Sequence, residues 1–376
     1  MNNSVIVDAV RSPIGVKNGN LVGVRPDELA AQVVTGLLKR NKNLDQYLIE
    51  DMIFGCAFPE GPQGMLISRG IGILAGLPNT VSGSVINRFC GSSMDAIHQM
   101  STKIESGDIE IGIAGGVEDM FSVPMGGFSP DFNTELAGKD YYISMGETAE
   151  ILAFEGNIPR AQQEEFSIKS HEKAINAISK KRFENEIIPI ENNRSKIILE
   201  DEGPRRPDIM KIKSLIPVFN KNGSITAATS SPISIGASAV LLTSENFAKK
   251  HGLTIRAYVI GRAVAGVDWR KMGIGPLPAT KKALKKANLK MSDIDLIELN
   301  EAFAAQALYV IKTGKWNESK ININGGSIAL GHPLGCSGAR IVTTLINTME
   351  QENQRIGLAT MCIGSGQGIS TIIKRA

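Results

Sequence analysis

Residues 85–94 read VINRFCGSSM: a short apolar strand, a sharp turn that carries Cys90, and the start of a helix. A second such junction lies about 246 residues further on, where residues 336–339, CSGA, open another helix. The strand-like segment 111–116 also has a counterpart, at 356–361, about 245 residues later. Pairs at a nearly constant offset indicate an internal duplication. The sequence therefore predicts two homologous α/β halves packed against each other.

The segments before these junctions repeat in the same way. A helical pattern at 27–39 is followed by a strand-like run at 51–55. About 244 residues later, a helical pattern at 280–286 is followed by a strand-like run at 295–299. The alternation of helical and strand-like segments favours an α/β layered fold in both halves.

Between the two copies the character of the chain changes. Residues 120–133 are rich in Gly, Pro and Met, residues 160–183 form a polar amphipathic helical pattern, and residues 191–208 are charged and irregular. An excursion of this length is usually functional or forms a subdomain of its own. The predicted domains are an N-terminal half (residues 1–118 with 232–253), a loop subdomain (residues 119–231) and a C-terminal half (residues 254–376).

The composition is that of a globular protein, with 42% hydrophobic and 21% charged residues among 376. The net charge of +3 is small, so we expect no general affinity for nucleic acid. Four cysteines without a CxxC pair and four scattered histidines predict free thiols in a reducing compartment and no metal site. No apolar run reaches the ~18 residues that span a bilayer, and no signal-like segment follows Met1. We therefore expect a cytoplasmic protein without membrane insertion.

Cys90 is the first candidate for chemistry. A thiol at the start of a helix lies near the positive end of the helix dipole and is surrounded by backbone N–H groups. Both effects favour the thiolate and make the sulfur a nucleophile. The alternative is a small buried cysteine in a tight turn, and residues 85–94 alone leave the two possibilities equally open.

His332 stands in the most unusual stretch of the sequence. Residues 324–338 read NGGSIALGHPLGCSG, with five glycines among fifteen residues around a single histidine that precedes a helix. Glycine on both sides implies close approach by backbone or ligand. A histidine is the natural base for a cysteine. The other three histidines, His98, His171 and His251, lie in ordinary helix-like surroundings, and we expect them to be structural.

Two further candidates follow predicted strands. Cys362 ends a strand and opens the Gly-rich residues 364–368, whose N–H groups could stabilise an oxyanion. A nucleotide-binding loop would need a helix next, but residues 369–371 resemble a strand. Asn300, with Glu301, follows the strand at 294–299 and is either a site residue or a helix N-cap.

Together these motifs resemble those of the thiolase family, most of all the bacterial 3-ketoacyl-CoA thiolases of fatty-acid β-oxidation. The resemblance covers essentially the whole chain. The motifs that carry it are NRFCGSS at 87–93, NEAF at 300–303, GHP at 331–333 and CIG at 362–364. It implies a thiolase-like fold with a five-stranded mixed sheet in each half, packed in layers. It also implies an acyltransferase that uses coenzyme A as a substrate and needs no cofactor or metal.

The resemblance implies a role for each catalytic candidate. Cys90 attacks the ketone carbon of the substrate and becomes acylated, and His332 deprotonates it and helps to bind a thioester oxygen. Asn300 holds a water that completes this first oxyanion hole. Cys362 moves the proton on the α-carbon of acetyl-CoA. The N–H groups of Cys90 and Gly364 form the second hole.

The resemblance also suggests residues that bind the substrate. Ser231 corresponds to a serine beside the pantetheine arm, and Met145 to a methionine of the acyl pocket. Phe303 is expected at the same pocket. Arg206 either meets a phosphate of coenzyme A or is a solvated surface charge.

At two positions the chain departs from the family pattern. Ser144 precedes Met145 at the place where acetoacetyl-specific members of the family carry a His-Met pair. This difference favours substrates with a wider range of acyl chain lengths. Ile235 stands where the family usually has an aspartate before Gly-Ala, which bears on local loop packing and on no catalytic group.

The expected activity is the reversible cleavage of 3-ketoacyl-CoA by coenzyme A to acetyl-CoA and a shortened acyl-CoA. Alternatives are a biosynthetic acetoacetyl-CoA thiolase and a non-catalytic acyl-CoA carrier. A ketoacyl synthase is disfavoured, because Cys362 holds the place of its second histidine. We expect a homodimer or homotetramer that pairs near the sheet edge at 84–87. The resemblance also allows a complex with a hydratase/dehydrogenase subunit.

Overall fold

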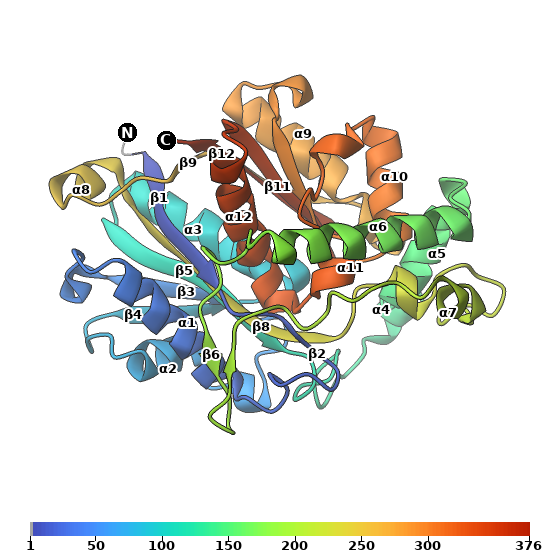
Figure 1. The fold of residues 1–376 in the computed structure, drawn as a ribbon, viewed down its shortest axis with the longest axis horizontal. Coiled ribbons are helices and arrows are strands. Elements are labelled where there is room, and N and C mark those ends of the chain that lie inside the picture. The colour runs from blue at the N-terminus through green and yellow to red at the C-terminus, as the bar shows by residue number, and fades with distance from the viewer. Residues whose placement is uncertain (1–2) are drawn as a thin grey trace.

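The computed structural model describes residues 3–376, and its N-terminal half is built on a mixed five-stranded sheet (Figure 1). The strands lie in the order β4 (Ser82–Ile86), β3 (Asp51–Gly55), β5 (Ile111–Asp119), β8 (Ser234–Ser244) and β1 (Ser4–Arg11). β3 runs parallel to β4 and β5, whereas β8 runs antiparallel to β5 and β1. A short strand, β2 (Gly15–Val16), also pairs with β8. Because β5 and β8 are buried along their whole length, their sequences are runs of small and apolar residues.

The C-terminal half repeats this order. Its strands are β10 (Leu296–Leu299), β11 (Ile356–Ile363), β12 (Gln367–Arg375) and β9 (Ala257–Gly266). The place that β4 takes in the first sheet is occupied here by Ile321, which forms a single bridge with Ile297. The expected fifth strand of this half is therefore reduced to one residue. The two sheets join edge to edge where β1 pairs with β9.

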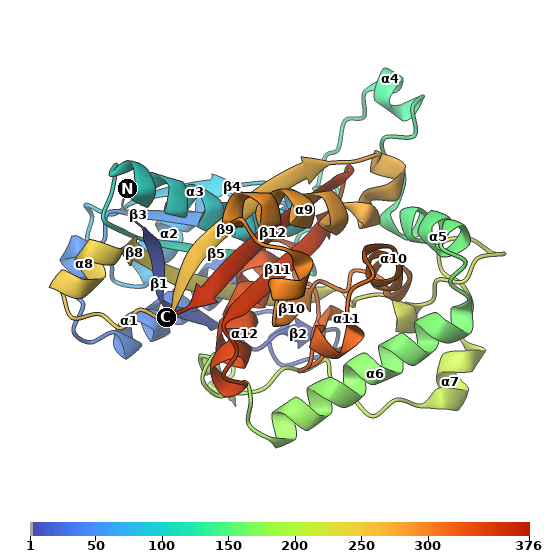
Figure 2. The same cartoon turned by 90° about the horizontal axis from the view of Figure 1, so that it is seen from above.

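Helices form three layers around the two sheets. α3 (Ser92–Ser106) and α12 (Leu334–Gln351) pack against each other between the sheets. α1 (Pro26–Arg40) and α2 (Ile67–Leu74) cover the outer face of the first sheet. α9 (Pro276–Ala287) and α10 (Ala304–Gly314) cover the outer face of the second, and Figure 2 shows α9 lying across β9 and β12. The predicted layered fold of two duplicated halves is confirmed, since α1, β3, α3 and β5 correspond to α9, β10, α12 and β11.

α12 is buried from Leu334 to Met349, although its sequence is rich in polar residues. The hydroxyls of Thr343 and Thr348 donate to carbonyl groups four residues earlier, at 2.9 and 2.7 Å. Such internal hydrogen bonds satisfy polar groups that water cannot reach. α12 can therefore lie between two sheets.

No helix within residues 3–376 has both the length and the apolar character that crossing a membrane requires.

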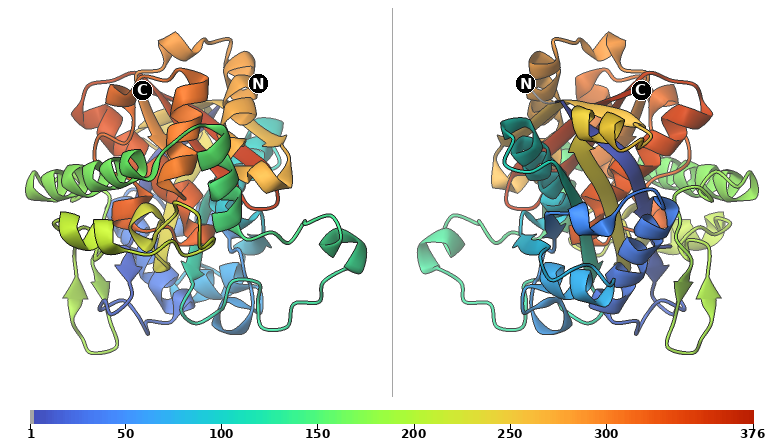
Figure 3. Two further views of the ribbon diagram at one scale, coloured as in Figure 1. Left: turned by 90° about the vertical axis from the view of Figure 1, so that its right-hand side faces the viewer. Right: turned by 90° about the vertical axis from the view of Figure 1, so that its left-hand side faces the viewer.

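The excursion between β5 and β8 carries most of the remaining elements. These are α4 (Thr134–Ala137), α5 (Met145–Glu155), α6 (Arg160–Ser179), β6 (Ile190–Glu191), β7 (Ile197–Ile198) and α7 (Ile209–Ser214). α6 packs on α10 and on α11 (Ser327–Leu330), so the excursion leaves the first half and covers the second. Figure 3 shows α4 at the tip of an extension that stands away from the body. After β8, α8 (Glu245–Lys250) leads into the second half.

A buried ion-pair cluster fastens this excursion to β1. Arg11 is fully buried, and its guanidinium donates to Glu186 at 2.6 Å and to both carboxylate oxygens of Asp201 at 2.7 and 2.9 Å. Asp201 also accepts the N–H of Ile14 at 2.8 Å. These partners satisfy charges that would otherwise be very costly to bury.

We predict that Arg11→Met strongly destabilises the protein, by about 3–5 kcal/mol, because it leaves two buried carboxylates without a cation. Thermal unfolding followed by circular dichroism measures the effect. Arg25→Met is the matched control, because Arg25 pairs with Asp27 at the surface and should change the melting temperature little. Equal shifts for the two variants would contradict the prediction.

Candidate active site

Cys90 lies in a single 3-10 turn, η3 (Phe89–Gly91), between β4 and α3. Ser92 holds the turn: its hydroxyl donates to the Phe89 carbonyl at 2.6 Å and accepts the Arg88 N–H at 2.9 Å. Phe89 has a φ of 43°, a left-handed conformation that turns the backbone sharply just before the sulfur. Cys90 is partly exposed, whereas the other three cysteines are buried. The predicted order of strand, turn and helix is confirmed.

Cys362 is buried near the carboxyl end of β11. Residues 364–366 form the tight turn that joins β11 to β12, and Ser365 and Gly366 have φ values of 60° and 75°. The N–H of Gly364 lies close enough to the Cys90 sulfur to lower the pKa of its thiol, so this turn lies beside the candidate nucleophile. A strand follows the Gly-rich turn, as predicted, and not a nucleotide-binding helix.

The side chains of Asn300 and His332 meet although they lie on different elements. Asn300 follows β10, His332 precedes α12, and Asn300 Nδ2 lies 3.3 Å from His332 Nε2. The other imidazole nitrogen, Nδ1, lies 2.6 Å from the hydroxyl of Ser337. Asn300 is not a helix cap, because α10 begins at Ala304 and Phe303 holds the N-cap position. Of the two possibilities that the sequence left open for Asn300, the geometry supports a site residue.

Burial sets the protonation of the nucleophile and the histidine. Burial raises the pKa of the Cys90 thiol to about 11, although the Gly364 and Cys90 N–H groups act to lower it. Burial, and then the charge of Arg340, lower the pKa of His332 to about 3. The N–H groups at the turn thus act in the direction expected from the sequence, and the desolvation that accompanies burial outweighs them. At pH 7 the resting site holds a neutral thiol and a neutral imidazole.

Cys362 is also a thiol at rest. Burial raises its pKa, and the neighbouring Cys90 sulfur raises it further. Because a charge on Cys90 is felt at Cys362, the two sulfurs share one small site. A negative charge on one sulfur therefore opposes ionisation of the other.

An apolar wall adjoins Cys362. It is formed by Phe303, Met272 and Ala149, and Met145 packs against it from α5. Met145 Sδ would lie 3.5 Å from a Cβ placed on Gly364.

Ser231 lies next to this wall, and its N–H and hydroxyl both donate to the Ala302 carbonyl, at 3.0 and 3.1 Å. Three of the four predicted substrate-binding residues, Met145, Phe303 and Ser231, are thus brought together. Arg206, the fourth, lies on an exposed segment.

The whole chain matches two families in succession: the N-terminal domain of thiolase over residues 4–246 and the C-terminal domain of thiolase over residues 253–375. The chain belongs to the thiolase family. It is 51% identical to a 3-ketoacyl-CoA thiolase of Acinetobacter baumannii, over 99% of this chain and 97% of that protein. It is 48% identical to a 3-ketoacyl-CoA thiolase of Photobacterium profundum, over the full length of both.

A solved thiolase-family structure has the same fold. The crystal structure of the Bacillus anthracis acetyl-CoA acetyltransferase aligns with a TM-score of 0.92 and 38% identity, over 100% of this chain and 99% of that one. The predicted family, fold class and acyltransferase activity are thus confirmed.

Ile235 is one position at which the sequence departs from the family pattern. Ile235, at the position where the family usually has an aspartate, is fully buried in the apolar core of the first half, so the departure replaces a polar group by a core residue.

His98 and His171 are buried, and His98 Nε2 bonds to Thr371 Oγ1 at 2.8 Å. His251 stacks on Phe247. The three histidines have structural surroundings, as expected.

Sequence reasoning missed three side chains that contact the site residues. Ser337 bonds to His332, Ser327 donates to Asn300 Oδ1 at 2.6 Å, and Arg340 donates to Ser327 at 2.6 Å. Ser337 and Arg340 lie in the first two turns of the helix after His332, and this position was the available signal. In the described part of the chain, no group of three His, Cys, Asp or Glu side chains is placed to hold a metal ion.

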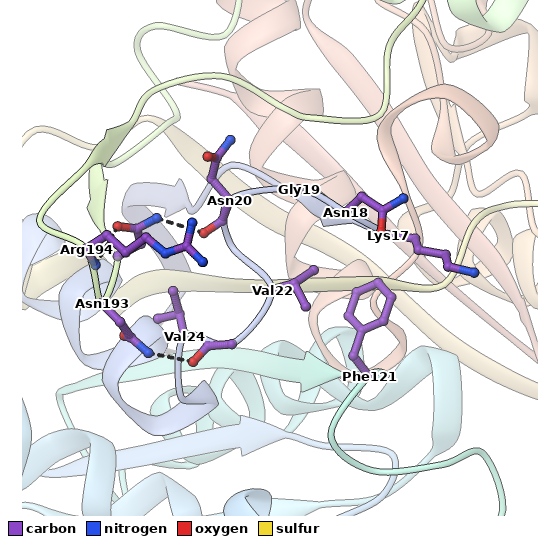
Figure 4. A pocket seen from close by; sticks show the side chains of 11 residues that line it. Lys17, Asn18, Gly19, Asn20, Val22, Val24, Phe121, Asn193 and Arg194 are labelled. Carbon is purple, nitrogen blue, oxygen red and sulfur yellow. Dashed lines mark hydrogen bonds between the residues drawn. The ribbon is translucent and has the colours of Figure 1, made fainter.

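A surface cavity of about 530 Å³ lies away from these groups (Figure 4). It is lined by residues 17–20, residues 22–24, Phe121 and residues 192–194, and by none of the catalytic candidates. Its cationic side chains, Lys17 and Arg194, are exposed. The cavity is therefore separate from the thiolase site.

We predict that iodoacetamide alkylates Cys90 slowly at neutral pH. The rate should rise about tenfold per pH unit up to at least pH 9.5, because the thiolate fraction grows with pH below the raised pKa. Mass spectrometry of the labelled peptide measures the rate, and Cys90→Ala identifies the labelled site. A plateau that begins below pH 7 would instead indicate a preformed thiolate–imidazolium pair.

Proposed function

We propose that the chain catalyses thiolytic cleavage of 3-ketoacyl-CoA by coenzyme A, through an acyl group carried on Cys90. The proposal is supported by Cys362 and the Gly364 N–H beside the Cys90 sulfur, and by the Asn300–His332 pair, since His332 precedes α12 and α12 contacts the turn that carries Cys90. Thiolysis needs a nucleophile and two acid–base steps, one at sulfur and one at carbon. Relatives at 48–51% identity that are named 3-ketoacyl-CoA thiolases support the substrate class.

In the first half-reaction, His332 Nε2 accepts the thiol proton while the Cys90 sulfur attacks the 3-keto carbon. The bond between C2 and C3 of the substrate then breaks, and the acyl chain remains on Cys90 as a thioester. The electron pair leaves on the acetyl-CoA carbanion, which takes the proton of Cys362. Because both resting groups are neutral, proton transfer from Cys90 accompanies the attack and does not precede it.

In the second half-reaction, the Cys362 thiolate takes the proton of the coenzyme A thiol. The coenzyme A sulfur attacks the acyl carbon, and Cys90 leaves as a thiolate that regains its proton from His332. The N–H groups of Cys90 and Gly364 stabilise the tetrahedral oxyanion, and the proximity of the Gly364 N–H to the sulfur supports this role. Asn300 and His332 serve the thioester oxygen of the acetyl-CoA unit.

We propose that residues 119–231 form a coenzyme A and acyl-binding subdomain between the two halves, residues 1–118 with 232–253 and residues 254–376. Met145 and Phe303 would line the acyl pocket, and Ser231 would face the pantetheine arm. Arg206 is the candidate for a phosphate of coenzyme A, and its exposure is compatible with that role.

Acetoacetyl-CoA specificity is the second candidate. It is favoured by the 38% identity to an acetyl-CoA acetyltransferase over the full chain. Ser144, which precedes Met145, is the N-cap of α5. Its side chain is engaged in a capping box with Glu147 and is therefore not free to line the acyl pocket. Turnover of acetoacetyl-CoA compared with that of a long-chain 3-ketoacyl-CoA distinguishes the two.

We predict that Cys90→Ala abolishes acyl-enzyme formation and lowers turnover by roughly 10³-fold or more, because the nucleophile is lost. Cys362→Ala should still accept an acyl group from acyl-CoA but fail to exchange the α-proton of acetyl-CoA in D₂O. Intact-protein mass spectrometry and NMR of the exchanged acetyl-CoA measure the two partial reactions. Cys336→Ala is the control for loss of a buried thiol. Normal α-proton exchange in Cys362→Ala would exclude the two-base scheme.

We also propose a cytoplasmic homodimer or homotetramer that pairs along β4. β4 is the end strand of the first sheet, and each of its residues is exposed or half-buried. An open apolar strand edge invites pairing with another chain. The chain has four free thiols, which suits a reducing compartment. A hydratase/dehydrogenase subunit remains a proposed partner from family resemblance.

We predict that light scattering at micromolar concentration gives a mass of at least twice the 40.3 kDa chain. Paired edges would hold β4, and with it the turn that carries Cys90, in place. Activity should be measured on the same column fractions. A fully active monomer would contradict the prediction.

A further inference from the structure

Behind Asn300 and His332 lies an unbroken chain of hydrogen bonds between buried side chains, here called the buried chain. It runs from Arg340 Nη2 to Ser327 Oγ (2.6 Å), from Ser327 Oγ to Asn300 Oδ1 (2.6 Å), from Asn300 Nδ2 to His332 Nε2 (3.3 Å), from His332 Nδ1 to Ser337 Oγ (2.6 Å), and from Ser337 Oγ to the Pro333 carbonyl (2.8 Å). Each of the five side chains is at most 4% exposed. Water therefore does not compete for these bonds.

The Arg340 end of the buried chain determines the direction of the bonds as far as His332 Nε2. A guanidinium can only donate and a carbonyl can only accept. Arg340 donates to Ser327, so the single hydroxyl proton of Ser327 goes to Asn300 Oδ1. The Asn300 amide is thereby oriented with its N–H groups toward His332 Nε2, which must present a lone pair.

The other end leads to the same tautomer. The Ser337 hydroxyl lies within hydrogen-bond distance of the Pro333 carbonyl, which also accepts the N–H groups of Cys336 and Ser337; when the hydroxyl donates to this carbonyl, its oxygen accepts the proton that His332 carries on Nδ1. An Nε2–H tautomer would face the Asn300 N–H groups, donor against donor. Turning the amide around would leave the Ser327 proton without an acceptor. The Nδ1–H tautomer is therefore the one that avoids a clash of donors between Asn300 and His332.

Fold stability does not account for Arg340. Within residues 3–376 its Nε and Nη1 have no hydrogen-bond partner, and Nη1 lies 3.8 Å from Glu298 Oε2, which also has none there. A buried ion pair with such geometry does not offset the cost of removing both charges from water. Glu298 precedes Asn300 by two residues on β10, so the pair lies directly behind the site.

We propose that Arg340 and Ser327 are positioning residues of the acylation step: they orient the Asn300 amide and thereby keep the lone pair of His332 on Nε2. The inference rests on the proposed role of His332 as the base for Cys90. When Nε2 takes the Cys90 proton, the Asn300 N–H that it had accepted loses its acceptor. That N–H then becomes available to the substrate side of the site. The positive charge of Arg340 acts in the same sense, because it lowers the pKa of His332 and favours the neutral ring.

The test compares Ser327→Ala, Arg340→Met and the double variant, with Thr343→Val as control. Thr343 lies on the same helix, and its buried hydroxyl bonds only to the Ala339 carbonyl. The rate of Cys90 acetylation by acetyl-CoA in a single turnover should fall roughly 10- to 100-fold in each single variant. The affinity for coenzyme A, measured by calorimetry, should stay within about twofold, because the buried chain does not reach the ligand. The double variant should be no slower than the slower single variant, because both remove one pathway.

Nitrogen-15 NMR of histidine-labelled enzyme provides a readout that a purely structural role would not move. In the wild type the His332 proton should lie on Nδ1, and in Ser327→Ala the signals should show a mixture of tautomers. A wild-type Nε2–H tautomer, single variants that acetylate at the wild-type rate, or fully additive losses would each overturn the inference. A wild type that forms no acetyl-Cys90 would instead refute the proposed function.

Discussion

The first turns of α3 and α12 touch backbone to backbone, and the candidate site depends on this contact. A Cβ at Gly338 would lie 2.4 Å from the Met94 nitrogen, a distance that no side chain tolerates. The N–H of Ala339 donates to the Ser93 hydroxyl at 2.9 Å and fixes the register of the two helices. Because both helices begin at one end of the central layer, the residues just before them, including Cys90, are held close to the ends of the sheets.

This arrangement divides the chemistry between the two halves of the duplication. The candidate nucleophile, Cys90, comes from the N-terminal half, whereas the candidates Asn300, His332 and Cys362 come from the C-terminal half. The matching elements of the first half therefore do not carry a second copy of the proposed site. The two sets of candidates are brought together because the sheets enclose α3 and α12. The ion pairs of Arg11 with Glu186 and Asp201 attach the excursion to the first sheet.

The enclosure that brings the groups together also sets their protonation. Packing between two sheets buries His332 and Cys362 and leaves Cys90 only partly exposed, and this loss of water favours the neutral form of each. A neutral site is stable at rest and becomes polar only when the substrate supplies a developing charge. The prearranged N–H groups then matter more than they would in water. In this dry environment, the buried chain gives the polar side chains of Asn300 and His332 hydrogen-bond partners within the protein.

The sequence by itself determined the duplication, the layered α/β class and the catalytic candidates. These are local patterns: a strand, turn and helix around Cys90, and glycines around His332, are specified by neighbours in the chain. Only the tertiary structure shows how strongly burial raises the pKa of Cys90 against the N–H groups of its own turn. It also decided the partners of Asn300, because Ser327 and Arg340 are distant in sequence and meet it only across packed elements. Desolvation and hydrogen-bond direction depend on what surrounds a group, and a linear pattern does not contain that information.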